Sequence, residues 1–369
     1  TRDKERIVMR TTVSATFLRG VIALLAALGS YPAAAESKPL TLVSSQTPPG
    51  KLDISLANEV QASVARGLDW LVSRQHDNGA WSNTNFPALT AIPLWALLNR
   101  DAPAYKPAVS NAVPVILSCV QPDGGIYSGA PGSKSGGLTT FNTAVCMTVL
   151  HETGDRKHIP IILKAREFVA ASQHLGDDIY KGGFGYDPRT GQAYTDVLNT
   201  YHAVQAMWAT ETVEKERTEG RKVDIQWEET IRFIERMQRQ AANGADGETG
   251  GLPAAPSTTA AASRGLPGSV PFRAYGSMTY AGMLSLIYAR LSPEDHRVRS
   301  AFDWASRRWS LDENPGMGRQ GLFFFYNVMA RCLSAHDQDL IPRPNGTYIS
   351  WREQLARKLV SMQKIDART

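Results

Sequence analysis

The chain has 369 residues, of which 43% are hydrophobic and 20% are charged, so it can bury a sizeable core and is not disordered throughout. The formal charge is +5, but the first 35 residues hold five basic and two acidic side chains, which leaves 35 basic against 33 acidic residues, or +2, in the rest. Because this remainder is nearly neutral and lacks a basic stripe with interleaved aromatic residues, we predict no nucleic-acid partner.

Residues 1–35 have the pattern of a secretory signal peptide. Basic side chains at Arg10 and Arg19 precede an apolar run at 20–29, and small residues at 33–35 form a cleavage site. The apolar run is shorter than the roughly 20 residues that span a bilayer. We therefore predict export to the periplasm or the extracellular space. A retained membrane anchor is the alternative, and association with a membrane surface stays open.

After a polar linker at 36–54, six segments have the apolar periodicity of a helix with one charged face. Most of them end at a glutamine, and the first five are followed by a glycine-containing turn. Because charged side chains cover one face, we expect these helices to form an outer layer. The six segments span residues 56–75, 113–121, 161–173, 225–240, 295–309 and 351–363.

Each of the first five turns leads into a second helix that is apolar almost all round, which is typical of a buried inner helix. These helices align on one column of residues: Thr90, Thr143, Thr200, Thr279 and Tyr326. Helix pairs repeating at about 50 residues stack into an open solenoid or close into a ring. Six outer helices favour the ring. We predict an all-α fold, an incomplete α/α toroid of about six helix pairs over residues 55–369.

Two features complicate this ring. A low-complexity segment rich in Gly, Pro, Ala and Ser at 241–269 is inserted between an outer and an inner helix, as a lid or as a merely disordered loop. Only residues 364–369 follow the sixth outer helix, so its inner partner is missing and one side of the ring is open. We expect that the sequence is part of a longer chain, or that a second subunit or the 241–269 segment covers the gap.

The three cysteines, Cys119, Cys146 and Cys332, lie in apolar helical surroundings and lack paired spacing. They are typical of small buried hydrophobic residues. If an exported chain oxidised one pair, we expect Cys119 with Cys146, because these two lie on successive helices.

The helix-ending turns carry a family resemblance. The segments Gln75 to Trp81, Gln121 to Tyr127 and Gly183 to Tyr186 resemble the Gln-Trp repeats of the squalene cyclase and protein prenyltransferase superfamily. The segments 275–282 and 311–321 resemble bacterial single-domain members with these repeats. The resemblance covers residues 55–363, and it implies an α/α toroid of inner and outer helices. If the chain is an enzyme, the resemblance implies chemistry of the cyclase or prenyltransferase type.

The residues for that chemistry are incomplete. Squalene-hopene cyclases protonate an alkene with the central acid of Asp-X-Asp-Asp-Thr, and the matching stretch here runs from Asp196 to Thr200, with Leu198 and Asn199 in place of the last two acids. Leucine donates no proton, so class II cyclisation is not expected. Asp196 is a helix cap or a substitute acid. Prenyltransferases bind zinc with a Cys and an Asp close in sequence, and that spacing is missing, so we predict neither metal nor cofactor.

The centre of the predicted ring supplies the remaining candidates. His202 is either a hydrogen-bonded core residue or a site residue, and Asp312 marks a turn where a further acid would be tested. The candidate catalytic residues are thus Asp196, His202 and Asp312. Aromatic and amide residues of the inner helices line a pocket or fill the ring as core. The candidate ligand-binding residues are Trp95, Phe141, Asn142, Asn199, Tyr201, Trp208, Tyr280, Phe325 and Tyr326.

Three functions follow from this sequence. The first is a terpenoid-cyclase-like protein that binds or transforms an apolar, isoprenoid-like ligand in the centre of the ring. The second is a noncatalytic exported interaction protein. The third is a carbohydrate-active α/α barrel, which requires paired carboxylates on inner helices, and the sequence offers no convincing pair.

Overall fold

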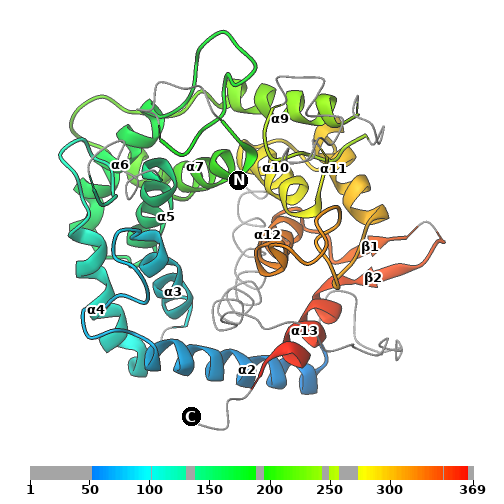
Figure 1. The fold of residues 1–369 in the computed structure, drawn as a ribbon, viewed down its shortest axis with the longest axis horizontal. Coiled ribbons are helices and arrows are strands. Elements are labelled where there is room, and N and C mark those ends of the chain that lie inside the picture. Colours follow the sequence, from blue (N-terminus) through cyan, green and yellow to red (C-terminus); the bar gives the residue numbers. More distant parts are fainter. Residues whose placement is uncertain are drawn as a thin grey trace, which may run out of the picture.

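A computed structural model shows a ring of paired helices, viewed down its axis in Figure 1. The structure describes residues 52–100, 102–129, 138–187, 195–242, 249–256, 273–343 and 345–364. The predicted signal peptide at 1–35, most of the linker at 36–54 and most of the insertion at 241–269 therefore lie outside the described residues. Within the described ranges, no helix has the length and apolar character to cross a membrane.

Helices alternate between two concentric layers, so the all-α toroid predicted from the sequence is confirmed (Figure 1). The outer layer consists of α2 (Ile54–Ser73), α4 (Lys106–Leu117), α6 (Ile159–Ala171), α9 (Trp227–Ala242), α11 (His296–Arg307) and α13 (Trp351–Met362). The inner layer consists of α3 (Ala88–Leu98), α5 (Thr139–Glu152), α7 (Val197–Ala209), α10 (Gly276–Tyr288) and α12 (Leu322–Ala335). The short elements are η1 (Pro103–Tyr105), η2 (Arg156–His158), α8 (Glu211–Lys215) and an antiparallel hairpin of β1 (Leu340–Pro342) and β2 (Tyr348–Ser350).

The two layers differ in burial as their sequences predict. Twelve of the thirteen residues of α10 are buried, against five of the twelve in α13. The inner faces of both layers join one continuous hydrophobic core that includes side chains from every helix pair. Burial of this core is the main favourable term in folding, because apolar area removed from water contributes about 25 cal/mol per Å².

In three of the repeats, the threonine column attaches the glycine turn to its inner helix. Thr143 Oγ1 accepts a hydrogen bond from the Ile126 N–H at 2.9 Å, Thr200 Oγ1 from Phe184 at 3.0 Å, and Thr279 Oγ1 from Leu252 at 3.0 Å. Each hydroxyl also donates to a carbonyl four residues earlier in its own helix. The repeated threonine is therefore a structural bond between turn and helix.

The glutamines that follow the outer helices connect neighbouring repeats. Gln75 Nε2 donates to the carbonyl oxygen of Ala108 in α4, and Gln173 Nε2 donates to the carbonyl oxygen of Gln226, just before α9. In the fourth repeat Gln238 has this role and donates to the Arg297 carbonyl in α11, two residues before Gln240, where the sequence placed the helix end. In these three repeats the glutamine thus joins one outer helix to the next along the ring, whereas Gln121 bonds the Cys119 and Tyr127 carbonyls of its own turn.

Glycine is required in these turns because the next outer helix approaches the backbone closely. Gly79, Gly124, Gly182 and Gly250 all have positive φ, between 84° and 101°. A Cβ at each position would come within 2.0 to 2.6 Å of a backbone carbonyl oxygen of the next outer helix. No side chain fits there without displacing a neighbouring helix.

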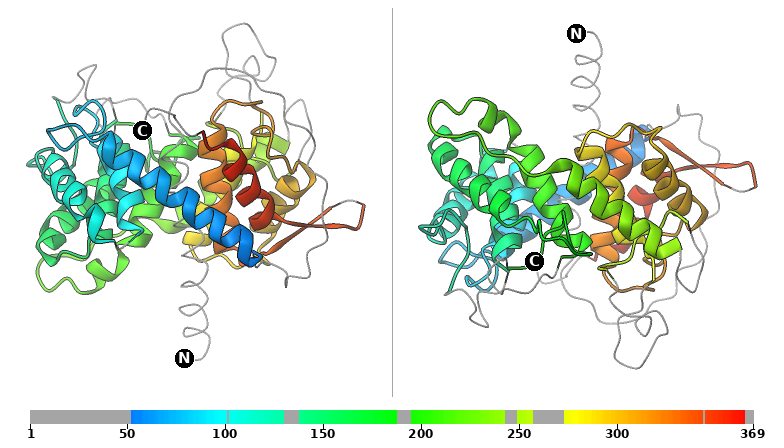
Figure 2. Two further views of the ribbon diagram at one scale, coloured as in Figure 1. Left: turned by 90° about the horizontal axis from the view of Figure 1, so that it is seen from below. Right: turned by 90° about the horizontal axis from the view of Figure 1, so that it is seen from above.

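The outer layer closes where the first and last outer helices meet, which the sequence did not predict. Six outer but only five inner helices lie within the described residues, as expected for an incomplete toroid. Helix α13 nonetheless packs beside α2 (Figure 2), and Gln363 Nε2 donates to the Ser63 carbonyl at 2.8 Å. Arg66 donates to Gln363 Oε1 at 2.9 Å, and Arg357 pairs with Asp53 at 3.3 Å. The expected gap is therefore confined to the inner layer.

All three cysteines are buried thiols, and no disulfide joins them. Burial raises the pKa of Cys146 and of Cys332 well above that of an exposed thiol. They act as small hydrophobic residues, as the sequence indicated.

Candidate ligand-binding site

His202 lies at the centre of the inner layer among aromatic rings. Its ring centroid is 4.9 Å from that of Phe141 on α5, 4.8 Å from Tyr201 and 6.4 Å from Phe324 on α12. The imidazole keeps part of its surface accessible, yet the surrounding protein desolvates it. This desolvation, together with the positive charge of Arg331, lowers the pKa of His202 to about 3. At neutral pH the imidazole is therefore uncharged, and the cluster is aromatic with two hydrogen-bonding side chains, His202 and Tyr201.

Arg331 brings a positive charge to the same region from α12. Its guanidinium carbon lies 4.6 Å from the ring centroid of Trp95 on α3, a cation–π contact between the two inner helices that flank the gap. Hydrogen bonding orients the Gln205 amide of α7 so that Oε1 accepts from both Arg331 Nη atoms and Nε2 donates to Tyr201 Oη at 3.2 Å. The Tyr288 hydroxyl of α10 forms a further hydrogen bond with Arg331. One side chain therefore connects four inner helices.

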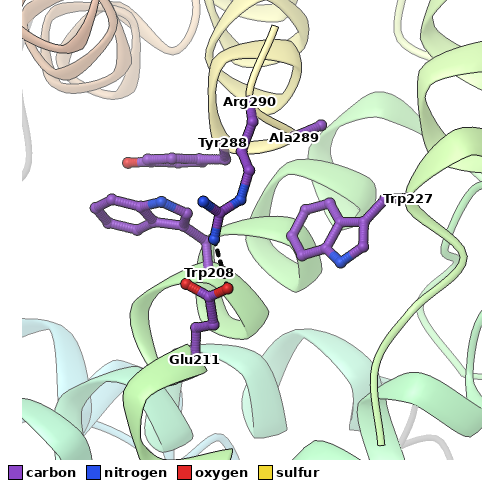
Figure 3. A pocket seen from close by; sticks show the side chains of 6 residues that line it. All are labelled: Trp208, Glu211, Trp227, Tyr288, Ala289 and Arg290. Atoms are coloured by element: carbon purple, nitrogen blue, oxygen red, sulfur yellow. Dashed lines mark hydrogen bonds and ion pairs between the residues drawn. The ribbon is translucent and has the colours of Figure 1, made fainter. Parts of the chain in front are cut away.

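A pocket of about 180 Å³ lies where α7 and α10 end. The rings of Trp208 and Tyr288 are stacked there with centroids 4.5 Å apart. Figure 3 shows the ion pair of Glu211 and Arg290 between this stack and Trp227. Because the Tyr288 hydroxyl bonds Arg331 while its ring lines the pocket, Tyr288 connects the pocket with the ring centre.

Asp196 is the N-cap of α7. Oδ1 accepts from the Asn199 backbone N–H at 2.7 Å, and Oδ2 accepts from Asn199 Nδ2 at 2.6 Å. Burial raises the pKa of Asp196 to about 6, although these hydrogen bonds act in the opposite direction. Both carboxylate oxygens of Asp196 are thus engaged at the start of α7, which is the helix-capping role and not that of an acid catalyst.

Leu198 is the residue that the sequence resemblance aligns with the central acid of the cyclase motif. It is half-buried and lies one helical turn before His202, so both side chains share one face of α7. In place of a proton donor, the face of α7 that carries His202 therefore has the apolar side chain of Leu198 at this position.

Asp312 lies away from this cluster. Its carboxylate is 81% exposed and pairs with Lys358 of α13 at 2.6 Å. An acid that protonates an alkene needs a poorly solvated setting, which this surface position does not supply.

Several candidate ligand-binding residues are packed as core instead of lining accessible space. Asn142 Oδ1 accepts from the Ala88 N–H at 3.1 Å and so supports the start of α3. The Tyr326 hydroxyl donates to the Leu311 carbonyl. Tyr280 and Phe325 contact each other with ring centroids 5.9 Å apart. The fully or nearly fully buried members of the predicted set are Asn142, Asn199, Tyr201, Tyr280, Phe325 and Tyr326.

The sequence analysis missed the polar partners of the aromatic cluster. Arg331 was detectable, because it is the only charged residue in the apolar segment 322–335, and a charge on a buried helix needs a reason. Gln205 and Tyr288 had no comparable signal. Among the described residues, no group of three or more His, Cys, Asp or Glu side chains is placed to hold a metal ion.

Comparison with known proteins gives only distant similarity. No family model and no curated protein sequence matches the chain. A solved structure described as a novel α-amylase from Clostridium perfringens is 11% identical, with a TM-score of 0.49 over 87% of this chain and 86% of that chain. A type II terpene cyclase from Scytonema, in complex with its product merosterolic acid A, is 13% identical, with a TM-score of 0.44 over 87% of each chain. Similarities at this level carry no argument about function.

Proposed function

We propose that this protein binds a largely apolar small molecule at the aromatic cluster around His202, of the isoprenoid type that the repeat resemblance implies. The observation that carries the proposal is the partly accessible, uncharged imidazole of His202 among aromatic rings from α5, α7 and α12. Such a surface, apolar with a few convergent polar groups, is typical of a small-molecule site.

Accessible apolar side chains on the inner layer support this proposal. Leu89 and Ile92 of α3 are 40% and 38% exposed, although the inner helices are otherwise strongly buried. Leu198 and Trp95 are only half-buried. Large apolar groups left accessible on the inner layer of a toroid favour a ligand that covers them.

In this proposal the protein does not cyclise its ligand by protonating an alkene. Leu198 replaces the acid, and Asp196 is engaged in the cap of α7. The positive charge of Arg331, which already disfavours protonation of His202, would also disfavour a carbocation formed beside it, because like charges repel strongly in a medium of low dielectric constant.

The carbohydrate alternative has less support. Glycoside hydrolysis generally uses two carboxylates, one on each side of the scissile bond. Of the residues that line the pocket beside Trp208, only Glu211 is acidic, and it is paired with Arg290.

The test begins with incubation of the purified protein in a lipid extract and identification of the retained molecule by mass spectrometry. Titration of that molecule should show binding by the wild type and affinity reduced about tenfold or more by His202→Ala or Phe141→Ala, roughly 1.4 kcal/mol or more. Tyr348→Ala removes a 66% exposed aromatic residue of the hairpin and should leave affinity unchanged. Thermal unfolding of each variant reports whether the fold is kept.

Two results would contradict the proposal. Retention of no molecule, or binding that neither ring-centre variant weakens, would show that the aromatic cluster is core and would favour the interaction-protein alternative. Conversion of squalene to a polycycle by the pure protein would show that another acid replaces Leu198.

A further inference from the structure

The guanidinium of Arg331 is buried without a carboxylate partner among the described residues. Only 9% of its surface is exposed, and its hydrogen-bond partners, Gln205 and Tyr288, are both uncharged. Glu152 acts on Arg331 through longer-range charge but forms no ion pair with it in the described part of the chain. Arginine stays charged at every physiological pH, so a net positive charge is held inside the ring.

A buried ion normally has a counter-ion, because removing a charge from water is costly unless it is paired. Arg166 shows the usual arrangement in this same protein: it is 1% exposed and pairs with Glu214 at 3.2 Å. Arg331 differs, because no described carboxylate forms an ion pair with it. It also keeps an unused donor, since its Nε has no hydrogen-bond partner among the described residues.

We propose that Arg331 binds the carboxylate of an amphipathic ligand whose apolar part lies against the cluster around His202. The geometry supports this: Arg331 lies over the face of Trp95, and Gln205 bonds both Arg331 and the Tyr201 hydroxyl of the cluster, so charge and apolar surface are adjacent. A carboxylate in the plane of the guanidinium accepts from Nε and shares an Nη donor, a bidentate arrangement that arginine favours. This inference rests on the proposed function and adds the chemical class of the ligand.

A monoanion fits better than a phosphate ester. Among the described residues, the carboxylate whose charge acts on Arg331 is Glu152, and the neighbouring His202 is neutral. A single guanidinium balances one negative charge, whereas a phosphate carrying close to two charges requires a second cation. Electrostatic balance therefore selects a carboxylate.

The experiment compares three ligands with one hydrocarbon chain: farnesoate, farnesol and farnesyl phosphate. Titrated into the purified protein at neutral pH, farnesoate should bind at least tenfold more tightly than farnesol. Arg331→Gln should remove this preference while keeping the affinity for farnesol, and Arg331→Lys should keep part of it. Arg308→Gln is the matched control, because Arg308 also lies over a tryptophan, Trp304, at 5.2 Å but on the exposed outer layer.

The possible results distinguish a failure of the role given to Arg331 from a failure of the proposed apolar site. Equal binding of farnesoate and farnesol by the wild type, a comparison that needs no variant, would overturn the role of Arg331 and leave the apolar site in place. Tighter binding of farnesyl phosphate than of farnesoate would overturn the choice of carboxylate. Binding of none of the three, together with no retained lipid, would overturn the proposed function itself.

Discussion

At the scale of single residues, the buried charged groups of this protein serve different purposes. Arg166 is satisfied by Glu214, by the Met207 carbonyl and by Thr210, and so holds α6 against the end of α7. Asp196 starts a helix at the cost of burying a carboxylate. Arg331 connects the inner helices and keeps a charge for which the described residues provide no ion pair. Only the last of these arrangements indicates a ligand.

Asp196 makes stability depend on pH. Its pKa is about 6 in the folded protein against 3.8 when unperturbed, so its favourable contribution is complete below pH 3.8 and is lost as pH rises through 6. Asp196→Asn removes the charge. If the side-chain amide of Asn199 rotates by half a turn, its Oδ1, which lacks a partner among the described residues, accepts a hydrogen bond from the side-chain amide introduced at position 196. We expect Asp196→Asn to stabilise the protein at pH 7 by up to about 3 kcal/mol.

Urea unfolding of wild type and Asp196→Asn from pH 4 to pH 8 checks this prediction. The difference between the two proteins should grow between pH 4 and 6 and then stay constant. Asp196→Ala, which removes the cap as well as the charge, should gain less or be destabilised. A difference that does not change with pH would contradict the raised pKa.

Arg166 should be among the most sensitive single positions. Arg166→Ala leaves Glu214 buried and short of one of its two arginine partners, and we expect a loss of about 3 to 5 kcal/mol in the free energy of unfolding. Arg232→Ala breaks an ion pair with Glu229 on the surface, where the arginine side chain is 62% exposed, and should cost less than about 1 kcal/mol. Denaturant unfolding of both variants measures the contrast, and equal losses would show that the buried pair is not special.

At the scale of elements, the turns between outer and inner helices carry the specificity of the fold. Each of the first four turns combines a glycine at positive φ with a glutamine bonded to neighbouring backbone. In three of these turns, a threonine hydroxyl of the inner helix also accepts a hydrogen bond from the turn. The helices themselves are ordinary amphipathic or apolar segments. Their spacing around the ring depends on how closely these turns let successive outer helices approach.

Gly182 provides the test of this close approach. Its φ is +88°, and a Cβ would lie 2.0 Å from the Glu229 carbonyl oxygen of α9. We expect Gly182→Ala to cost roughly 2 to 4 kcal/mol, from backbone strain and displacement of the neighbouring helix. Gly154 has φ +69° but no atom within 4 Å of the added Cβ, so Gly154→Ala should cost only about 1 kcal/mol. Thermal unfolding distinguishes the two, and equal effects would attribute the cost to backbone conformation alone.

At the scale of the whole molecule, the ring is held closed by the same kind of contact that joins its repeats. The Gln363 side chain donates to a backbone carbonyl of α2 in the same way as Gln75 donates to a backbone carbonyl of α4. The last outer helix is therefore joined to the first by the same contact that joins the first to the second. In the inner layer, the cation–π contact of Arg331 with Trp95 joins the first and the last of the described inner helices, α3 and α12. The termini of the ring are therefore coupled in both layers.

Gln363→Ala should loosen this closure. Removing its bonds to Ser63 and Arg66 should cost about 1 to 2 kcal/mol. Amide hydrogen exchange should quicken in α2 and α13 together while α5 and α7 stay protected. Ser361→Ala, which alters only a bond within α13, is the control. Faster exchange in α13 alone would show that the two helices are not coupled.

The sequence alone determined the architecture, because the apolar periodicity of a helix and the residues that end it are local features of the chain. Apolar spacing distinguished inner from outer helices, and the repeated Gln, Gly and Thr marked their junctions. The placement of Leu198 one turn before His202 was likewise readable, since both lie on one helix. Of the residues in the candidate site, His202, Phe141 and Trp95 were predicted from the sequence, because side chains of the inner helices are expected to line the centre of a ring.

The tertiary structure alone decided how residues from different helices combine. Arg331 meets Trp95 of α3, Gln205 of α7 and Tyr288 of α10 although these residues are far apart in sequence, and no local pattern records such distances. It also decided that Tyr280, Phe325 and Tyr326 are packed as core while Trp208 borders a pocket. Helix periodicity shows which residues face inward, but accessibility depends on how neighbouring side chains fill the space around them.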